Sequence, residues 1–206
     1  MTTIELVDAA IGTGLAAALP PLSLTLEPGA PTVVAVETDE RPMVLSLVLG
    51  GRLALSSGSI LVDGAENADE LRRRVALVDT PFASEPSPGV ALSITVAEEL
   101  AFAGLPSGGR AVRAFLESHD LAPFSAIATR ALPSTARVLL LSELAALRPG
   151  VTALVVTSPE RHGGDPAAWF ATLRGVAERG LVVAIVTDSA TSALLGRLGA
   201  TTKAAS

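Results

Sequence analysis

The chain holds two histidines, and the first of them stands between a serine and an aspartate. Ser118-His119-Asp120 contains the three residue types of a nucleophilic triad, in which an imidazole takes a proton from a hydroxyl. Residues that are adjacent in a chain do not face one another, so this run does not supply the geometry of a triad. We therefore interpret His119 as a cap or a solvated turn at the end of a helix.

The second histidine lies in a run whose side chains would offer ligands to a metal ion. Glu160, His162 and Asp165 bring one imidazole and two carboxylates close together in the chain. Their spacing is not that of a zinc site, and the absence of cysteine excludes thiolate sites and disulfides. We expect no metal site, and we interpret residues 160–165 as a mobile polar loop.

Two further runs suggest phosphate binding without completing it. Arg72-Arg73-Arg74 would attract acidic lipid headgroups, but the carboxylates of residues 66–70 stand beside it and favour a salt-bridged helix face. Gly108-Gly109 has no lysine after it, and we interpret it as a flexible loop. The chain has one lysine, Lys203, and it has no glutamine or tyrosine.

The composition is typical of one globular domain. Apolar residues make up 49% of the 206 residues, and the mean hydropathy is +0.51. The net charge of −6 would repel a phosphate backbone, and aromatic residues at 3% leave few surfaces for base stacking, so we expect no nucleic-acid partner. The N-terminus lacks signal-peptide features, and no apolar run approaches the ~20 residues that span a bilayer. We expect a cytoplasmic protein without direct membrane insertion.

Hydrophobic periodicity predicts the elements that position these residues. Strands are expected at residues 4–7, 22–26, 32–36, 59–62, 75–78, 151–156 and 181–186. Helices are expected at residues 42–49, 69–74, 95–103, 110–118, 137–146, 166–179 and 190–198. Thr95 and Glu98 have the spacing of a capping box, and Trp169 and Phe170 are expected in the core. The pattern predicts an α/β fold, a mostly parallel sheet flanked by helices, with an antiparallel β edge.

The order of these elements and several segments resemble an ABC transporter nucleotide-binding domain, an ATP-binding cassette with a P-loop NTPase-like fold. Residues 50–64 are similar to the family's run after the P-loop helix, usually of the form A-G-L-x-x-P-x-S-G-x-I-x-x-D-G. Further segments resemble the strand that enters the P-loop, the run before the Q-loop, the family's L-T-V-x-E-N-L and the D-loop. These segments are residues 22–29, 71–78, 93–100 and 165–166, in that order.

The resemblance implies one cassette over residues 1–206. Its RecA-like core, including the β edge, would consist of residues 1–78 and 147–206. A Q-loop-like segment and a helical subdomain would occupy residues from about 79 to 146.

The segment that matches the P-loop lacks the chemistry by which such a loop holds ATP. A working loop needs small residues whose N–H groups cradle phosphate, a lysine on the β and γ oxygens, and a hydroxyl on magnesium. The matching residues include no glycine, hold three carboxylates, and place Pro42 at or next to the lysine position. They are Glu37, Thr38, Asp39, Glu40, Arg41, Pro42, Met43 and Val44.

The other functional positions of the family are replaced as well. The Walker B strand does not end in the magnesium-holding Asp and the water-activating Glu, and Glu160 follows the proline on the wrong side of that turn. The signature glycines, the Q-loop glutamine and the switch histidine are also missing. The matching residues are Thr157 and Ser158 at Walker B, Pro133, Ser134 and Thr135 at the signature, Asp79 or Thr80 at the Q-loop, and Asp188 at the switch.

The resemblance therefore implies a non-catalytic, pseudo-ATPase subunit with a structural or regulatory role on a membrane transport complex. No catalytic residue and no cofactor is expected, and the partners would be an integral membrane transport subunit or a sister ABC cassette at the inner face of the cell membrane. In the family, a coupling helix of the membrane subunit docks beside the Q-loop, which matches residues 79–106 here. Part of the apolar set in this stretch must be core and the rest would form a docking patch; the set is Phe82, Leu92, Ile94, Val96 and Phe102.

Two alternatives remain open from the sequence. In the first, divergent loops still bind ATP and magnesium, and the chain is an ordinary ABC transporter ATPase. In the second, the chain is an unrelated cytosolic enzyme or interaction domain on an α/β fold.

Overall fold

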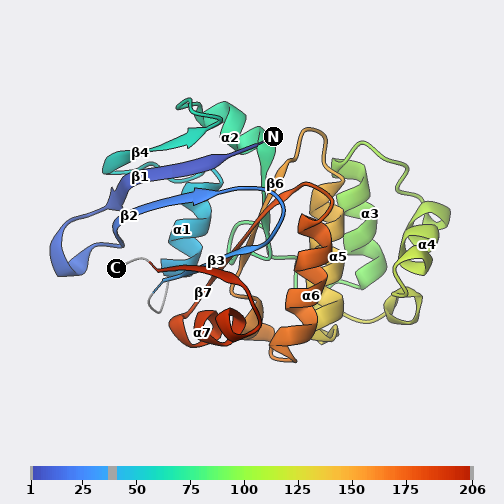
Figure 1. Ribbon diagram of the computed structural model, residues 1–206. Helices are drawn as coiled ribbons and strands as arrows, with labels where there is room; N and C mark the ends of the chain where they lie inside the picture. The colour runs from blue at the N-terminus through green and yellow to red at the C-terminus, as the bar shows by residue number, and fades with distance from the viewer. Residues whose placement is uncertain (1, 37–40, 205–206) are drawn as a thin grey trace.

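The structure is a computed structural model that describes residues 2–36 and 41–204. Those residues form a five-stranded sheet of order β5-β6-β7-β3-β8 and a three-stranded sheet of order β2-β1-β4 (Figure 1). The strands are β1 (Ile4–Ile11), β2 (Leu19–Leu26), β3 (Thr32–Ala35), β4 (Ser57–Val62), β5 (Val75–Val78), β6 (Ala153–Thr157), β7 (Val182–Thr187) and β8 (Thr201–Ala204). The α-helices are α1 (Arg41–Leu49), α2 (Ala68–Arg74), α3 (Leu92–Phe102), α4 (Gly109–Ser118), α5 (Ser134–Ala146), α6 (Pro166–Ala177) and α7 (Ser189–Arg197). The 3-10 helices are η1 (Gly14–Ala16), η2 (Ala122–Phe124), η3 (Thr129–Ala131) and η4 (Pro159–His162).

The five-stranded sheet is parallel at each of its pairings. Every residue of β3, β5, β6 and β7 is buried. Parallel strands are covered on both faces, which explains why these segments are continuous β-branched and aliphatic runs in the sequence. The predicted parallel α/β fold is therefore confirmed. Because parallel strands end at the same edge, the residues that follow β3, β5, β6 and β7 are brought together.

The three-stranded sheet is antiparallel, as the alternation in the first residues of the chain predicts. Its inner side chains, such as Ile4, Leu6 and Leu26, are buried, whereas Val7 on the outer face is exposed. These inner side chains share one apolar core with α1 and with one face of the parallel sheet. The three-stranded antiparallel sheet thus covers α1, and α1 lies between it and the parallel sheet.

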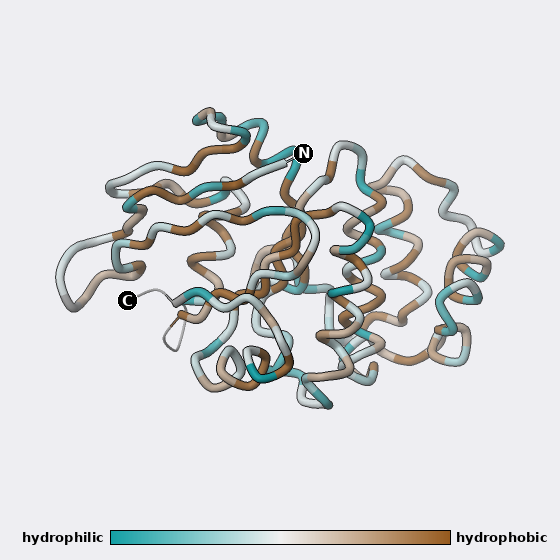
Figure 2. Tube along the Cα trace, in the orientation of Figure 1, coloured by the Kyte–Doolittle hydropathy of each residue, from teal (hydrophilic) through white to brown (hydrophobic). Residues whose placement is uncertain are grey.

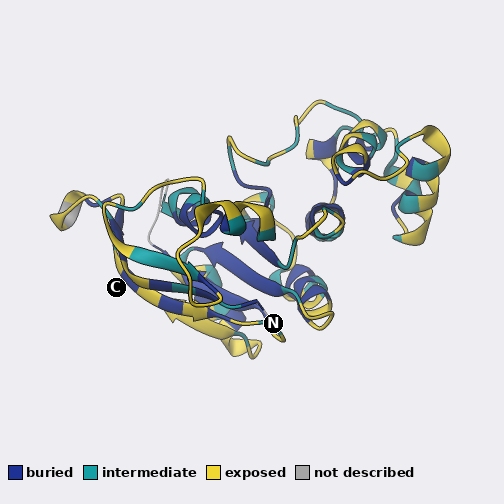
Figure 3. Ribbon diagram, turned by 90° about the horizontal axis from the view of Figure 1, so that it is seen from above, coloured by how far each residue is buried: buried dark blue, intermediate teal, exposed yellow. Residues whose placement is uncertain are grey.

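A second core covers the other face of the parallel sheet. It is formed by side chains of α3 to α7 packed on β5, β6 and β7. Trp169 and Phe170 are both buried there, as predicted. Figure 2 shows hydrophobic stretches concentrated in the central strands, and Figure 3 shows α4 at the far end of the molecule with much of its surface exposed. None of the helices within the described ranges is long and apolar enough to cross a bilayer.

The start of α3 differs from the prediction. The helix begins at Leu92, and Thr95 is buried inside it with its hydroxyl 3.1 Å from that of Thr129, so the predicted capping box is wrong. The first amides of the helix are satisfied by distant carbonyls instead. Leu92 N donates to Ile127 O at 2.9 Å, and Ser93 N donates to Ser125 O at 3.0 Å. A tertiary contact has replaced the side-chain cap that the local sequence indicates.

Candidate functional site

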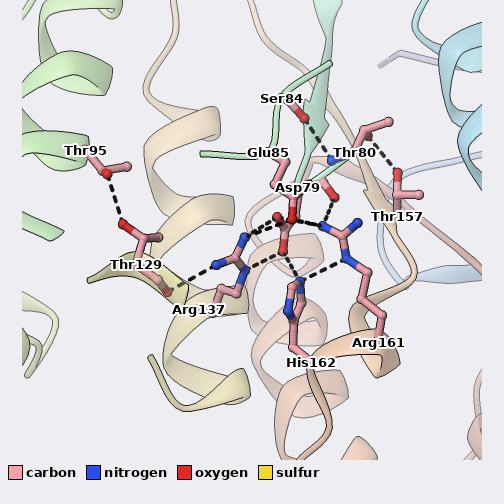
Figure 4. Close-up of polar contacts among 10 residues, drawn as sticks. All are labelled: Asp79, Thr80, Ser84, Glu85, Thr95, Thr129, Arg137, Thr157, Arg161 and His162. Atoms are coloured by element: carbon pink, nitrogen blue, oxygen red, sulfur yellow. Dashed lines mark hydrogen bonds and ion pairs between the residues drawn. The ribbon is translucent and has the colours of Figure 1, made fainter. Parts of the chain in front are cut away.

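A chain of buried hydroxyls lies where the carboxyl ends of the parallel strands meet. Thr157 ends β6, and its Oγ1 lies 2.7 Å from Oγ1 of Thr80, just after β5, and donates to Oγ of Ser46 at 2.8 Å. Ser46 Oγ in α1 donates to the carbonyl of Pro42 at 2.8 Å. Since the single proton of Thr157 goes to Ser46, Thr80 must donate to Thr157. Figure 4 shows the Thr80–Thr157 contact.

These hydroxyls leave little capacity for a metal ion. All three side chains are buried, they carry no charge, and each hydrogen-bonds another member of the chain. Magnesium gives up its water reluctantly and is held in proteins chiefly by carboxylates and substrate phosphates. The hydroxyl chain therefore provides a neutral, self-satisfied contact between α1, β5 and β6.

A cluster of acidic and basic side chains lies next to Thr80; we call Asp79, Glu85, Arg137, Arg161 and His162 the Asp79 cluster (Figure 4). Arg137, in α5, donates from Nε to Oδ2 of Asp79 at 2.7 Å and from Nη2 to Oδ1 at 2.6 Å. Arg161, in η4, reaches Asp79 Oδ1 at 3.0 Å and Glu85 Oε1 at 3.2 Å. Nε2 of His162 lies 2.8 Å from Asp79 Oδ2 and 2.9 Å from Arg161 Nε.

The electrostatics of the cluster depend on Asp79, which is 5% exposed. Burial by itself would raise the pKa of this carboxyl. Hydrogen bonds from Arg137 and His162 and the charges of Arg137 and Arg161 together outweigh burial and hold the pKa well below its ordinary value. Asp79 is therefore a carboxylate at neutral pH.

The same cluster brings together three groups that would suit a metal ion. Each of these groups offers one possible ligand atom, a carboxylate oxygen or an imidazole nitrogen, and the three atoms lie within 4.8 Å of one another. The residues are Asp79, Glu85 and His162. However, Arg137 and Arg161 already donate to the Asp79 oxygens, and Arg161 also reaches Glu85. Two carboxylates are thus balanced by two guanidinium groups, and a cation entering here would have to displace Arg161 against the charge of Arg137. The arrangement fits an ion network better than a metal centre.

Glu160 is a second acid at this edge of the sheet, and it is half-buried. Burial raises the pKa of its carboxyl, the charge of Asp188 acts in the same direction, and the nearby Thr187 and Ser158 hydroxyls oppose the rise only in part. Within the described residues, Oε2 of Glu160 and Oγ1 of the fully buried Thr187 have no close hydrogen-bond partner. Although Glu160 follows the proline of the turn, its carboxyl therefore lies beside the residues that end β7.

Comparison with known proteins gives a fold. No protein-family model matches the chain, and no curated protein matches it. A solved structure of an ATP-binding subunit of an ABC transporter is 16% identical, with 94% of this chain and 82% of that chain covered and a TM-score of 0.63. A bacterial ABC transporter cassette, solved as a dimer, is 17% identical, with 91% of this chain and 88% of that chain covered and a TM-score of 0.68.

The chain has the fold of an ABC transporter cassette. Within this cassette fold, part of the predicted degenerate P-loop lies outside the described residues: Glu37, Thr38, Asp39 and Glu40. The rest of that segment opens α1. Arg41 donates from Nη2 to the carbonyl of Ala17 at 3.3 Å, Pro42 is buried, and Met43 and Val44 are half-buried.

The remaining cassette positions have structural contacts of their own. Ser158, predicted to match the water-activating Glu, has a left-handed backbone with φ 45° and leads into η4. Asp188, predicted to match the switch histidine, caps α7 and accepts from Thr191 N at 2.6 Å.

In the segment predicted to match the signature, Pro133 precedes α5, and Ser134 and Thr135 open the helix. Ser134 is buried against Gly164, where an added Cβ would overlap its Oγ. The N-terminus of α5 is therefore covered by the chain's own loop before α6.

The predicted docking residues divide into two groups. Phe82, Phe102 and Ile94 are exposed by 99%, 73% and 51%, respectively. Leu92 and Val96 are fully buried, so their assignment to a docking patch is wrong. These two residues stand four apart on α3, which places both on the face of the helix that packs against the core.

Three interpretations of polar runs can be compared with the structure. His119 is the C-cap of α4, with Nδ1 2.8 Å from the Phe115 carbonyl, which confirms a helix-end residue. Arg72-Arg73-Arg74 form ion pairs with Asp63, Asp69 and Glu70, as predicted. Gly108-Gly109, predicted as a flexible loop, instead caps and opens α4.

The Asp79 cluster is the feature that the sequence did not reveal. The interpretation of residues 160–165 as a mobile polar loop is wrong over residues 160–162, which belong to η4 and bring Arg161 and His162 into the cluster. Arg137 was placed only as the first residue of a helix. One signal was available: an aspartate directly after a buried parallel strand lies at the edge where functional side chains gather.

Proposed function

We propose that this chain is a non-catalytic ABC-type cassette, a pseudo-ATPase subunit with a structural or regulatory role on a membrane transport complex. The observation that carries the proposal is the buried hydroxyl chain of Ser46, Thr157 and Thr80. In the resemblance to the family, Thr157 matches the magnesium-holding Walker B aspartate, and Thr80 is one of the two residues that match the Q-loop glutamine. Neutral hydroxyls that are already paired offer a metal–triphosphate complex no compensating charge.

The loss of several groups together supports the absence of turnover. Removing one positioned charge from a phosphoryl-transfer site typically lowers the rate about 10³-fold or more. Here the lysine, the metal-binding aspartate and the water-activating glutamate are all replaced, and the sequence contains no lysine before Lys203. Glu160 does not fill the position of that glutamate, because it stands two residues after Ser158 and beyond Pro159.

The exposed phenyl ring of Phe82 supports a role in docking. Phe82 has φ 58°, which is unfavourable for a bulky residue, and its side chain is almost entirely exposed. The turn around it is held by Thr80, whose carbonyl accepts from the amides of Ala83, Ser84 and Glu85 at 2.9 to 3.1 Å. A fold that stabilises a strained backbone to present an aromatic ring to solvent favours a binding surface. We propose an integral membrane transport subunit as the partner, which would place the cassette at the cytoplasmic side of the membrane.

Nucleotide binding tests the first part of the proposal. A fluorescent ATP analogue is titrated with the full chain in the presence of magnesium, and no saturable signal is expected up to millimolar protein. Saturable binding with a micromolar Kd would overturn the proposal in favour of a cassette that still binds ATP through divergent loops. An Arg41→Ala variant then reports whether such binding uses the start of α1.

Docking is tested by purification from detergent extracts of the native cells. We expect the chain to bring down a multi-span membrane protein, identified by mass spectrometry, and Phe82→Ser to lose it. Leu198→Ser is the matched control, because Leu198 is another exposed apolar residue and lies at the end of α7, away from this turn. A soluble monomer without a membrane partner would contradict the docking role, and recovery of a second cassette alone would replace it with a paired cassette.

A further inference from the structure

The Asp79 cluster joins three segments that are far apart in the sequence. Asp79 follows β5, Arg137 lies in α5, and Arg161 and His162 lie in η4. Arg137 is 3% exposed and makes two hydrogen bonds to Asp79, so the link between β5 and α5 is both buried and oriented. With two carboxylates and two guanidinium groups, the cluster needs no counter-ion.

The same network continues from Arg137 to α3. Nη1 of Arg137 donates to the carbonyl of Thr129 at 3.2 Å. The Thr129 hydroxyl lies 3.1 Å from that of Thr95 in α3, and it donates to the carbonyl of Val90 at 3.0 Å. A continuous set of hydrogen bonds therefore runs from α3, through Thr129 and Arg137, to Asp79 and η4 (Figure 4).

Arg161 holds both ends of the turn that presents Phe82. Its Nη2 lies 2.7 Å from the carbonyl and 3.0 Å from Oδ1 of Asp79, where the turn begins. The same Nη2 lies 3.2 Å from Oε1 of Glu85, where the turn ends. The Arg161 side chain is only partly buried, so its removal would release the turn without leaving a cavity in the core.

The backbone of the turn requires such a restraint. Asp79 and Phe82 have φ values of 56° and 58°, in the left-handed region that side chains disfavour. Backbone of this kind persists only where the surrounding contacts determine it. Within the turn, the Thr80 carbonyl accepts from the amides of residues 83–85, and Thr80 N donates to Ser84 Oγ. Among the described residues, the basic side chains that reach the start and end of the turn from other segments are Arg137, Arg161 and His162.

We propose that the Asp79 cluster is a latch that holds residues 79–85 in one conformation without any ligand, and that Arg161 is its releasable part. The inference deepens the proposed function and rests on it for the role of Phe82 in docking. Its consequence is a docking surface that is presented permanently, with no dependence on the nucleotide state of the cassette. Release of Arg161 would melt the turn and remove the surface.

Hydrogen exchange followed by mass spectrometry tests the latch on the full chain. In Arg161→Ala, the amides of Ala83, Ser84 and Glu85 are expected to exchange about tenfold faster or more than in the wild type, because local opening is no longer opposed. Arg179→Ala is the matched control, since Arg179 makes a surface ion pair with Glu143 at 2.9 Å and should leave this peptide unchanged. Exchange in Arg161→Ala equal to that of the wild type would overturn the proposal.

Two further measurements separate the latch from stability and from the proposed function. If Arg161→Ala does not fold, the test uses Glu85→Gln, because the exposed Glu85 carboxylate anchors the end of the turn. Faster amide exchange at residues 83–85 in this variant supports the latch, and unchanged exchange overturns it. Millimolar Mg-ATP is expected to leave wild-type exchange in residues 79–91 unchanged, and a nucleotide-dependent change there would overturn a ligand-independent latch. Nucleotide binding elsewhere, with the Arg161→Ala effect intact, would defeat the proposed function and leave the latch standing.

Discussion

Arg137 and Asp79 stand 58 positions apart in the chain and form a two-point ion pair, with Nε–Oδ2 at 2.7 Å and Nη2–Oδ1 at 2.6 Å. The pair connects the end of β5, an edge strand of the five-stranded sheet, to the first turn of α5. A buried ion pair adds little net stability relative to an apolar pair, yet the loss of one partner leaves an uncompensated charge. The consequences of this pair for stability and pH dependence can be measured.

Replacing Arg137 should lower the free energy of unfolding strongly, whereas replacing a surface arginine should lower it little. Arg137→Met removes the more buried of the two guanidinium groups on the Asp79 carboxylate, leaves Arg161 in place, and is expected to lower the free energy of unfolding by at most about 3–5 kcal/mol. Arg179→Met breaks an exposed pair with Glu143 and is expected to cost about 0–1 kcal/mol. Urea denaturation of both variants checks this. Equal, small losses in the two would show that the Asp79 pair is not a buried link.

Asp79 should make the protein sensitive to acid. Its pKa in the folded chain lies below the ordinary value of 3.8, so its contribution to stability is fully present above about pH 4 and is lost as the pH falls toward the folded-state pKa. The wild type is therefore expected to lose stability over this acidic range more steeply than Asp79→Asn. Urea midpoints measured between neutral and strongly acidic pH give the two slopes. Parallel slopes would contradict a depressed pKa at Asp79.

Glu160 should change the pH dependence of stability in the opposite direction to Asp79. Its pKa is raised above the ordinary value of 4.5, chiefly by burial, so its favourable neutral form is present below that value and is lost as the pH rises through the folded-state pKa. Glu160→Gln keeps the shape and removes the charge, and it should be more stable than the wild type at neutral pH. The advantage should disappear below about pH 4.5. A variant that is less stable at neutral pH would indicate that the charged carboxylate has a partner.

The contact between Gly164 and Ser134 gives a steric test with an internal control. Gly164 has φ 82°, so alanine there incurs the left-handed penalty of about 1–2 kcal/mol, and the added methyl would also overlap Oγ of Ser134 at the start of α5. Gly164→Ala is therefore expected to lower the melting temperature, and to lower it less in a Ser134→Ala background, where the overlapping hydroxyl is absent. Equal shifts in the two backgrounds would show that the loop does not cover the N-terminus of α5.

The parallel sheet was predictable because its strands are buried on both faces and therefore consist of unbroken apolar residues. The docking set was only partly predictable. The four-residue spacing of Leu92 and Val96 places both residues on one face of a helix. This spacing identifies the face that packs in the core only once the helix is known to begin at Leu92. The start itself depends on the carbonyls of Ile127 and Ser125, which no local pattern reveals.

The Asp79 cluster shows why a site is harder to predict than a fold. The partners of Asp79 come from Arg137 and Arg161, which are 58 and 82 positions away, and their side chains meet only after the strands and helices have packed. Locally, each of them belongs to an ordinary polar stretch. The hydroxyl chain is similar, because Ser46 and Thr157 are 111 positions apart.

The most direct test of the central claim is a crystal of the full chain soaked in millimolar Mg-ATP. The buried hydroxyls of Ser46, Thr157 and Thr80 predict that no triphosphate and no magnesium will be seen between the start of α1 and the end of β6. Density for a nucleotide seated against residues 37–44, with a metal ion near Thr157, would contradict it.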